Sequence, residues 1–240
     1  MTYEPTRDGV LLINFGEPTS PDLDEIVSFL ERVFFANAIL GADSSTDEAR
    51  RRSRELAERR APGLIEEYRR IGGSPLDRQA RAQASALAEE FTRRGHAAHV
   101  GSAMQFTDPT IEHALQRLRD LGVSRLAVVP VYPLCGPSTT VASLEAVAAA
   151  LDTLDWNPAV AEVTGWHRHP GYVRLRARSI VASARTAGID LADPAVELVF
   201  SAHGTPMRYI EDGSRYVEYV EDWCGRVARE ASIDSYTVGY

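Results

Sequence analysis

The chain has little cysteine, no surplus of positive charge and no long apolar run. Its two cysteines, Cys135 and Cys224, are too few for a disulfide framework or a four-cysteine metal site, so we interpret both thiols as structural. The formal net charge of −8 argues against a nucleic-acid partner, because such partners require a basic surface. No stretch approaches the roughly 18 apolar residues of a membrane span, so we expect no transmembrane segment.

Other features of the composition are typical of a globular protein. Residues 1–8 are polar and lack the basic-then-apolar pattern of a secretion signal, so we expect a cytoplasmic protein, with peripheral membrane contact left open. Hydrophobic residues make up 44% and charged residues 25%, which allows a sizeable core without metal or disulfide support. Arginines gather at residues 50–60 and again at 69, 70 and 78. They predict a solvated helix face or, alternatively, a rim that attracts the carboxylates of an anionic ligand.

Strand-like and helix-like segments alternate along the chain. The expected strands are residues 9–14, 99–104, 126–131, 160–165, 196–200 and 236–240. The expected helices are residues 21–35, an arginine-rich helix from residue 45, and residues 76–94, 108–122, 143–154, 171–187 and 216–231. Such alternation predicts an α/β fold with a parallel sheet covered on both faces.

The pattern fits two α/β halves that meet near residue 150. We therefore expect domains at residues 1–150 and 151–240, with residues 160–165 opening the second set of elements. The last strand-like run stops at Tyr240 with no helix after it, so we expect the second domain to be incomplete and the chain to be truncated at its C-terminus.

Local signals mark several helix ends. Ser20 offers an N-cap and Pro21 a first helical position. Ser45 and Glu48 have the spacing of a capping box, and Gly95 is a plausible helix stop.

His203 lies where a run of strand-forming residues (196–200, VELVF) ends in a turn of small residues (201–206, SAHGTP). In open parallel sheets, ligands bind outside the carboxyl ends of the strands. An imidazole placed there can bind a metal or transfer a proton. The alternative is a turn residue whose ring nitrogens bond the backbone.

Five strings, taken in order, resemble those of the ferrochelatase family. They are residues 12–18 (LINFGEP), 68–76 (YRRIGGSPL), 132–133 (YP) with 138–140 (STT), 200–206 (FSAHGTP) and 236–240 (YTVGY). Each string alone is weak, but the ordered set covers nearly the whole chain. The resemblance implies two similar doubly wound, Rossmann-like chelatase domains with a porphyrin cleft between them.

The resemblance also implies an activity, the insertion of Fe²⁺ into a free-base porphyrin to give a heme and two protons. The porphyrin is protoporphyrin IX or coproporphyrin III, the iron is a substrate, and no cofactor is consumed. By resemblance His203 is the catalytic residue, because a neutral imidazole can accept a pyrrole proton or bind ferrous iron. The carboxylate that completes the site in the family belongs to a later motif that this chain does not contain.

Five further residues match family positions that face the porphyrin. Phe15 follows the first strand, and a core aromatic is its alternative role. Tyr68 and Ser74 match a loop that lines the cleft, which could otherwise simply connect two helices. Ser138 and Thr139 follow a strand end, where hydroxyls can bond a propionate or cap the next helix.

The chain departs from the family pattern at three places. Gln105 and Phe106 stand where many relatives have Arg-Tyr, which removes a charge and a hydroxyl. Residues 212–216 (DGSRY) lack the common Asp-Pro before the tyrosine. Pro137 occupies the position of the mid-chain cysteine that holds an iron–sulfur cluster in some relatives, so we expect no such cluster.

A histidine pair and a group of acidic residues each allow two interpretations. His167 and His169 would share a metal if they lay on a strand, but Pro170 favours a loop that enters a helix. Glu218, Glu221 and neighbouring acids form a helical stripe that could feed cations but is more typical of a solvated face.

Two other functions fit parts of the pattern. A non-catalytic porphyrin or heme carrier, or an inactive fragment, would explain the missing acidic motif. A chelatase that inserts cobalt into another tetrapyrrole would also share the turn around His203.

Overall fold

The structure is a computed structural model that describes residues 7–39 and 45–240. Contacts divide the chain into two units. Unit 1 comprises Met1–Val131 and Ser138–Val163, and unit 2 comprises Tyr132–Pro137 and Thr164–Tyr240. The chain therefore leaves unit 1 after residue 131, returns at residue 138 and leaves it again after residue 163.

Unit 1 is built on a parallel sheet of four strands in the order β2-β1-β3-β4. The strands are β1 (Asp8–Asn14), β2 (Ala98–Met104), β3 (Arg125–Pro130) and β4 (Ala159–Glu162). The chain passes from β1 to one neighbour, β2, and then crosses to β3 on the other side of β1. Such a reversal creates a switch point at the carboxyl ends of β1 and β3, where open α/β sheets bind ligands.

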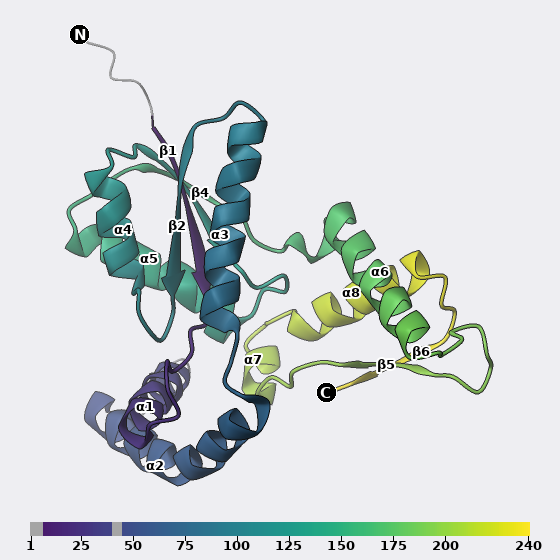
Figure 1. Ribbon diagram of the computed structural model, residues 1–240. Coiled ribbons are helices and arrows are strands. Elements are labelled where there is room, and N and C mark those ends of the chain that lie inside the picture. Colours follow the sequence, from purple (N-terminus) through teal and green to yellow (C-terminus); the bar gives the residue numbers. More distant parts are fainter. Residues whose placement is uncertain (1–6, 40–44) are drawn as a thin grey trace. The chain divides into compact units, whose positions relative to one another are not determined.

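Helices cover both faces of this sheet, as the alternation predicted. Helix α3 (Leu76–Arg93) lies on one side, and α4 (Ile111–Asp120) and α5 (Ala142–Thr153) lie on the other (Figure 1). The main core lies between β1, β3, α4 and α5; its most buried side chains include Leu11, Ile13, Leu115, Leu126 and Val128. Their burial follows from the near-continuous apolar runs of the central strands.

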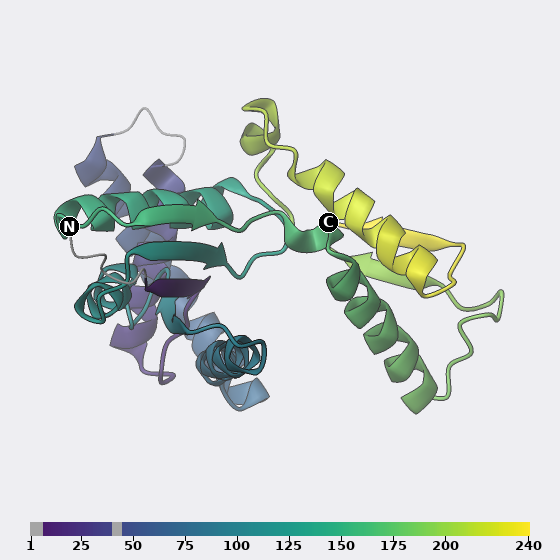
Figure 2. The same cartoon turned by 90° about the horizontal axis from the view of Figure 1, so that it is seen from above.

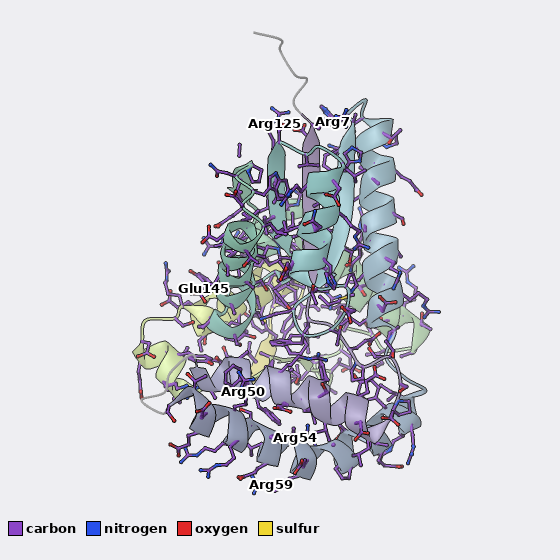
Figure 3. All side chains as sticks on the ribbon, turned by 90° about the vertical axis from the view of Figure 1, so that its left-hand side faces the viewer. Arg7, Arg50, Arg54, Arg59, Arg125 and Glu145 are labelled. Carbon is purple, nitrogen blue, oxygen red and sulfur yellow. The ribbon has the colours of Figure 1, made fainter. Side chains whose placement is uncertain are left out.

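A helical hairpin lies beyond the carboxyl ends of the strands (Figure 1). It consists of α1 (Leu23–Ile39) and α2 (Thr46–Ile71), which pack along each other around Ile26, Leu30 and Ala57. Figure 3 shows three of the clustered arginines, at positions 50, 54 and 59, along α2. They are exposed, as both a solvated helix face and a rim that attracts anionic ligands require.

Unit 2 contains a two-stranded parallel sheet and two longer helices. Strand β5 (Leu198–Ser201) pairs with β6 (Tyr236–Gly239), and α6 (Pro170–Thr186) packs against α8 (Tyr216–Glu230) (Figure 2). Short helical turns occur at η2 (Trp166–Arg168) and α7 (Met207–Glu211). Val173, Ala177 and Val227 are the buried centre, with Phe200 and Trp223 packed against it.

The α/β class and the parallel sheet are confirmed, but several details differ. β4 does not open a second set of elements, because it pairs with β3 as the fourth strand of the first sheet. β5 is shorter than expected and not fully buried, since Val199 is 57% exposed on the two-stranded sheet.

Two predicted helix starts also move. The Ser45 hydroxyl accepts from the Glu48 amide, which confirms that cap. At α1, however, Asp22 Oδ1 accepts from the amides of residues 24 and 25, so Asp22 takes the role expected of Ser20. At α4 the helix begins at Ile111 rather than at residue 108, because Thr110 is the N-cap and its hydroxyl accepts from the His113 amide.

The core of unit 1 gives a direct stability prediction. Leu115 is fully buried, whereas Leu121, at the end of the same helix α4, is 45% exposed. Leu115→Ala should lower the free energy of unfolding of unit 1 by about 2–5 kcal/mol, because it leaves a cavity. The matched change Leu121→Ala should cost less than about 0.5 kcal/mol. Denaturant titration by circular dichroism measures both, and equal costs would contradict this assignment of the core.

Candidate functional site

The loops that follow β1 and β2 are bonded to each other beyond the ends of the two strands. The Gln105 amide donates to the Asn14 carbonyl at 2.8 Å, and the Phe106 amide donates to the Phe15 carbonyl at 3.0 Å. Between them Gly16 has a φ of +94°, and a Cβ there would lie 2.4 Å from the Thr107 hydroxyl oxygen. Only glycine fits this turn, so the backbone around Phe15 has a fixed path.

Aromatic rings gather at this edge of unit 1. The Phe15 ring lies 4.7 Å from that of Phe106 and 6.2 Å from that of Phe29, both edge to face. Tyr68 packs against the same group. Phe15 is half-buried and Phe106 is 7% exposed. Phe15 is therefore part of a packed aromatic group, which is the alternative role considered for it, and its contact with porphyrin stays a prediction.

The second string forms the tight loop between α2 and α3. Gly72 and Gly73 have φ values of +74° and +89°, and their amides bond back to the last turn of α2. The Ser74 hydroxyl accepts from the Leu76 amide at 3.3 Å. Burial raises the pKa of Tyr68, and the negative charge of Glu17 raises it further. The half-buried Tyr68 hydroxyl therefore stays protonated and can donate a hydrogen bond at neutral pH.

Glu17 is a site residue that the sequence reading missed. It is 8% exposed, and its Oε1 accepts from the Asp77 amide at 2.8 Å, which joins the first string to the start of α3. A signal was present in the sequence, because Pro75, the N-cap of α3, has no side-chain acceptor for the free amides of the first turn.

The hydroxyl string after β3 forms a helical turn, η1 (Pro137–Val141), that runs directly into α5. Ser138 and Thr139 are half-buried, and the Ser138 carbonyl accepts from the Gln105 side-chain amide at 3.0 Å. The N-cap position of α5 is occupied by Val141, whose side chain has no hydrogen-bond acceptor. Ser138 lies three positions earlier and does not cap this helix. The hydroxyl of Ser138 therefore has no capping role that competes with ligand binding.

Unit 1 thus brings four of the predicted porphyrin-binding residues to the carboxyl edge of its sheet. Phe15 follows β1, and Tyr68 lies in the same aromatic group. Ser138 and Thr139 follow β3 and are tied to the loop after β2 through the side chain of Gln105. This edge contains the switch point between β1 and β3.

His203 lies in unit 2, two residues after the end of β5. The Ala202 amide bonds the Gly239 carbonyl at 2.8 Å and continues the pairing of β5 with β6. His203 itself is exposed, and its ring makes no hydrogen bond to any residue that the structure describes. Its ring nitrogens are not used by the backbone, as the alternative turn role would require.

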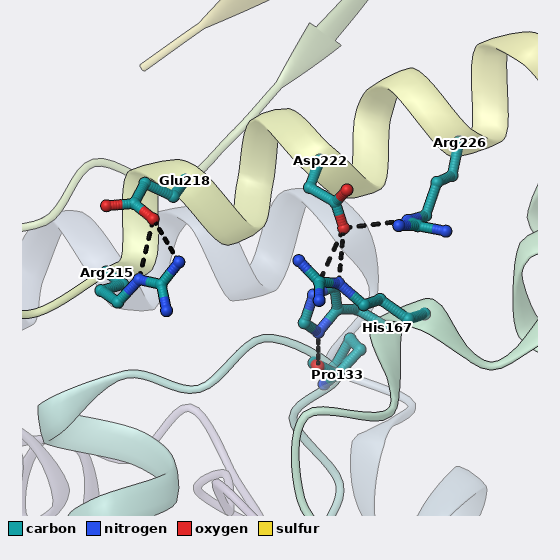
Figure 4. A network of polar contacts seen from close by, with 7 residues as sticks. Pro133, His167, Arg215, Glu218, Asp222 and Arg226 are labelled. Atoms are coloured by element: carbon teal, nitrogen blue, oxygen red, sulfur yellow. Dashed lines mark hydrogen bonds and ion pairs between the residues drawn. The ribbon is translucent and has the colours of Figure 1, made fainter.

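The other histidines of unit 2, His167 and His169, have structural roles, and Figure 4 shows that of His167. The Pro133 carbonyl accepts from both the backbone amide and Nδ1 of the buried His167, at 3.1 and 3.2 Å. His169 caps α6 by accepting from the Gly171 amide. Within residues 7–39 and 45–240, no group of three histidine, cysteine or acidic side chains could hold a metal. Residues 166–168 form a short 3-10 turn that leads into α6 rather than a strand, so the predicted loop is confirmed.

Two acidic side chains of the α8 stripe, Glu218 and Asp222, are paired with arginines (Figure 4). Glu218 pairs with Arg215 at 2.7 Å, and Asp222 Oδ2 accepts from Arg168 at 2.7 Å and Arg226 at 2.9 Å. These arginines hold the pKa of Asp222 down to about 2. The stripe is thus an ion-paired helix face.

The two thiols differ in their surroundings. Cys224 is 1% exposed within unit 2, and burial raises its pKa to about 11. A thiol with so high a pKa is unreactive at neutral pH, in keeping with a structural role. Cys135 is half-buried.

An open α/β sheet with polar and aromatic side chains at its switch point defines a class of ligand-binding α/β proteins. Comparison with known sequences is more specific: the sequence model named Ferrochelatase matches residues 7–240. The chain belongs to the ferrochelatase family.

Individual relatives agree with this. A ferrochelatase of Nitrosococcus oceani is 32% identical over 212 residues, which are 88% of this chain and 56% of the relative. One of Synechococcus sp. is 32% identical over 94% of this chain and 65% of the relative. The chloroplastic ferrochelatase-2 of Cucumis sativus is 31% identical over 89% of this chain and 42% of its own length. The chain therefore spans roughly two thirds or less of the length of these relatives.

The buried His167 gives a prediction about pH. Burial lowers its pKa below the ordinary 6.5 and outweighs the hydrogen bond to the Pro133 carbonyl, which raises it; Arg168 and Arg226 lower the pKa further, and Asp222 raises it. Because the unfolded chain then binds more protons, unit 2 should lose stability as the pH falls below 6.5. Asp222 does not contribute in this window, since its lowered pKa matters only below 3.8.

His167→Asn separates this effect from other titrations, because asparagine keeps an N–H donor for the Pro133 carbonyl but does not titrate. Thermal unfolding between pH 7 and pH 5 should show a shallower loss of stability in the variant. Equal slopes in both proteins would contradict the buried, neutral state of His167.

Proposed function

We propose that this protein inserts Fe²⁺ into a free-base porphyrin, giving a heme and two protons. The pyrrole nitrogens lose two protons as they bind the metal, so the reaction consumes no cofactor and changes no oxidation state. Membership in the ferrochelatase family supports the activity. The observation that carries the residue assignment is the free imidazole of His203 in the turn after β5.

His203 is proposed to act on the metal or on the pyrrole protons. A neutral imidazole has one nitrogen lone pair, which can bind ferrous iron or accept a proton. Because the ring is exposed and not bonded to the described chain, no internal hydrogen bond has to break first. Iron is here a substrate that passes through the site.

The carboxyl edge of unit 1 is proposed to supply the porphyrin contacts. The macrocycle is flat and apolar with propionates at one edge, so it needs aromatic walls and hydroxyl donors. Phe15 and Tyr68 offer the aromatic surface. Ser74, Ser138 and Thr139 offer hydroxyls, and the Ser138 carbonyl is already held by Gln105, so the turn needs little reorganisation to bind.

Protoporphyrin IX and coproporphyrin III both suit this surface, and they differ in the number of carboxylates to be bound. We propose that the protein works without an iron–sulfur cluster and in the cytoplasm, with peripheral membrane contact left open. Among the described residues, no helix is both long and apolar enough to cross a bilayer.

The first test replaces the proposed catalytic residue. His203→Ala should reduce the rate of metal insertion by at least about 100-fold, the scale of a lost acid–base or metal-binding group. Porphyrin affinity should stay within about twofold, since the imidazole is not a porphyrin wall. His113→Ala, which removes an exposed histidine from unit 1, is the control and should leave both values unchanged. Near-normal turnover in His203→Ala would overturn the assignment.

The second test addresses the propionate anchors. Ser138→Ala and Tyr68→Phe each remove one hydroxyl, and a hydrogen bond to a charged group is worth about 1.5–3 kcal/mol. Porphyrin affinity, measured by fluorescence quenching, should therefore fall about tenfold or more in each. Because Ser138 does not cap α5, its thermal unfolding should match that of Ser85→Ala, an exposed serine of α3. Lost stability with unchanged affinity would make Ser138 structural.

A further inference from the structure

The start of α3 depends on a side chain from elsewhere in unit 1. Pro75 at the N-cap position provides no side-chain acceptor, and the Ser74 hydroxyl bonds the Leu76 amide only at 3.3 Å. The next amide, that of Asp77, donates instead to Glu17 Oε1 at 2.8 Å, across 60 positions of sequence. A carboxylate at a helix N-terminus is favourable because it faces the positive end of the helix dipole.

Glu17 is fixed for this contact. It is 8% exposed and follows Gly16, whose backbone conformation only glycine adopts easily in this space. Its second oxygen, Oε2, is buried and accepts no hydrogen bond from any described residue. Burying a carboxylate in this way costs free energy unless the remaining interaction compensates. The contact with α3 is therefore a specific structural device and not a surface ion pair.

The contact joins two loops that carry proposed porphyrin residues. Phe15 lies two positions before Glu17 in the chain. Asp77, at the other end of the contact, lies in the first turn of α3, just after Ser74 in the short loop that follows α2, and Tyr68 lies in the last turn of α2. The charge of Glu17 also acts on the Tyr68 hydroxyl, which shows that the two groups lie within electrostatic reach. The hydrogen bond from the Asp77 amide to Glu17 therefore joins the start of α3, next to Ser74, directly to the turn after β1.

We propose that Glu17 is a positioning residue for porphyrin binding: it docks the start of α3 onto the turn after β1 and so holds Tyr68 and Ser74 beside Phe15. This role rests on the proposed function, because it assigns those three residues to the porphyrin wall. Glu17 itself touches neither the porphyrin nor the iron.

The first experiment tests the contact without porphyrin. Hydrogen exchange of the Asp77 amide should be about tenfold faster in Glu17→Ala, which is the loss expected for one charge-assisted hydrogen bond. Glu17→Gln keeps an acceptor oxygen and should restore most of the protection. Thr110→Ala removes the N-cap of α4 in the same unit and should leave the Asp77 amide unchanged. Unchanged exchange in Glu17→Ala overturns the proposal.

The second experiment separates positioning from a general loss of stability. Porphyrin affinity is measured by fluorescence quenching for the parent, Tyr68→Phe, Glu17→Ala and the double variant. Tyr68→Phe should weaken binding about tenfold in the parent but less than about twofold in the Glu17→Ala background, because the loop is no longer held in place. Glu17→Gln should bind porphyrin nearly as well as the parent, and Thr110→Ala should do so despite a similar loss of thermal stability.

The outcomes distinguish a failure of the positioning role of Glu17 from a failure of the proposed function. A tenfold effect of Tyr68→Phe in both backgrounds would overturn the role of Glu17 while leaving the porphyrin site intact. If the parent protein bound no porphyrin at all, the proposed function would fail, and the positioning role would fail with it.

Discussion

The parallel pairing of β1 with both β2 and β3 is the constraint on which unit 1 depends. Its register places Asn14 beside Met104 and Ile13 beside Pro130, so three chain segments leave the sheet at the same edge. Backbone hydrogen bonds then continue past the strands and hold Gln105 and Phe106 against the turn after β1. The aromatic group, the Glu17 contact and the η1 turn are all built on this edge.

Much of this arrangement could be predicted from the sequence. Apolar strands alternating with amphipathic helices indicate a parallel α/β fold, and most predicted elements lie within a few residues of their observed positions. The exceptions have physical causes. β4 is a short strand whose sheet is decided by pairing with β3, which no local pattern encodes. Asp22 and Ser20 are both acceptable helix caps, and only the geometry of the turn selects Asp22.

The candidate site shows the same division between local and long-range information. Motif resemblance selects Phe15, Tyr68, Ser138 and His203, but it does not show that Phe15 packs edge to face on Phe106. Nor does it show that Glu17 reaches α3, because a contact across 60 positions requires the fold itself. His167 is the converse case: Pro170 already favoured a loop over a metal-binding strand, and the structure uses the imidazole to bind the Pro133 carbonyl.

Gln105 and Phe106 have physical roles at this edge of the sheet. The Gln105 side-chain amide holds the Ser138 carbonyl, and the Phe106 ring fills a buried site beside Phe15. These two contacts hold the loops after β1, β2 and β3 together at the edge of the sheet. A rigid edge suits the binding of a flat, rigid ligand, since less freedom is lost on binding.

The most direct test of the central claim is an anaerobic absorbance titration, in which this protein is mixed with free-base porphyrin and Fe²⁺ and the spectrum is followed over time. The account predicts that the free-base bands are replaced by those of the metalloporphyrin, with two protons released per porphyrin and a rate well above that without protein. Porphyrin that binds but keeps its free-base spectrum in the presence of iron would contradict it.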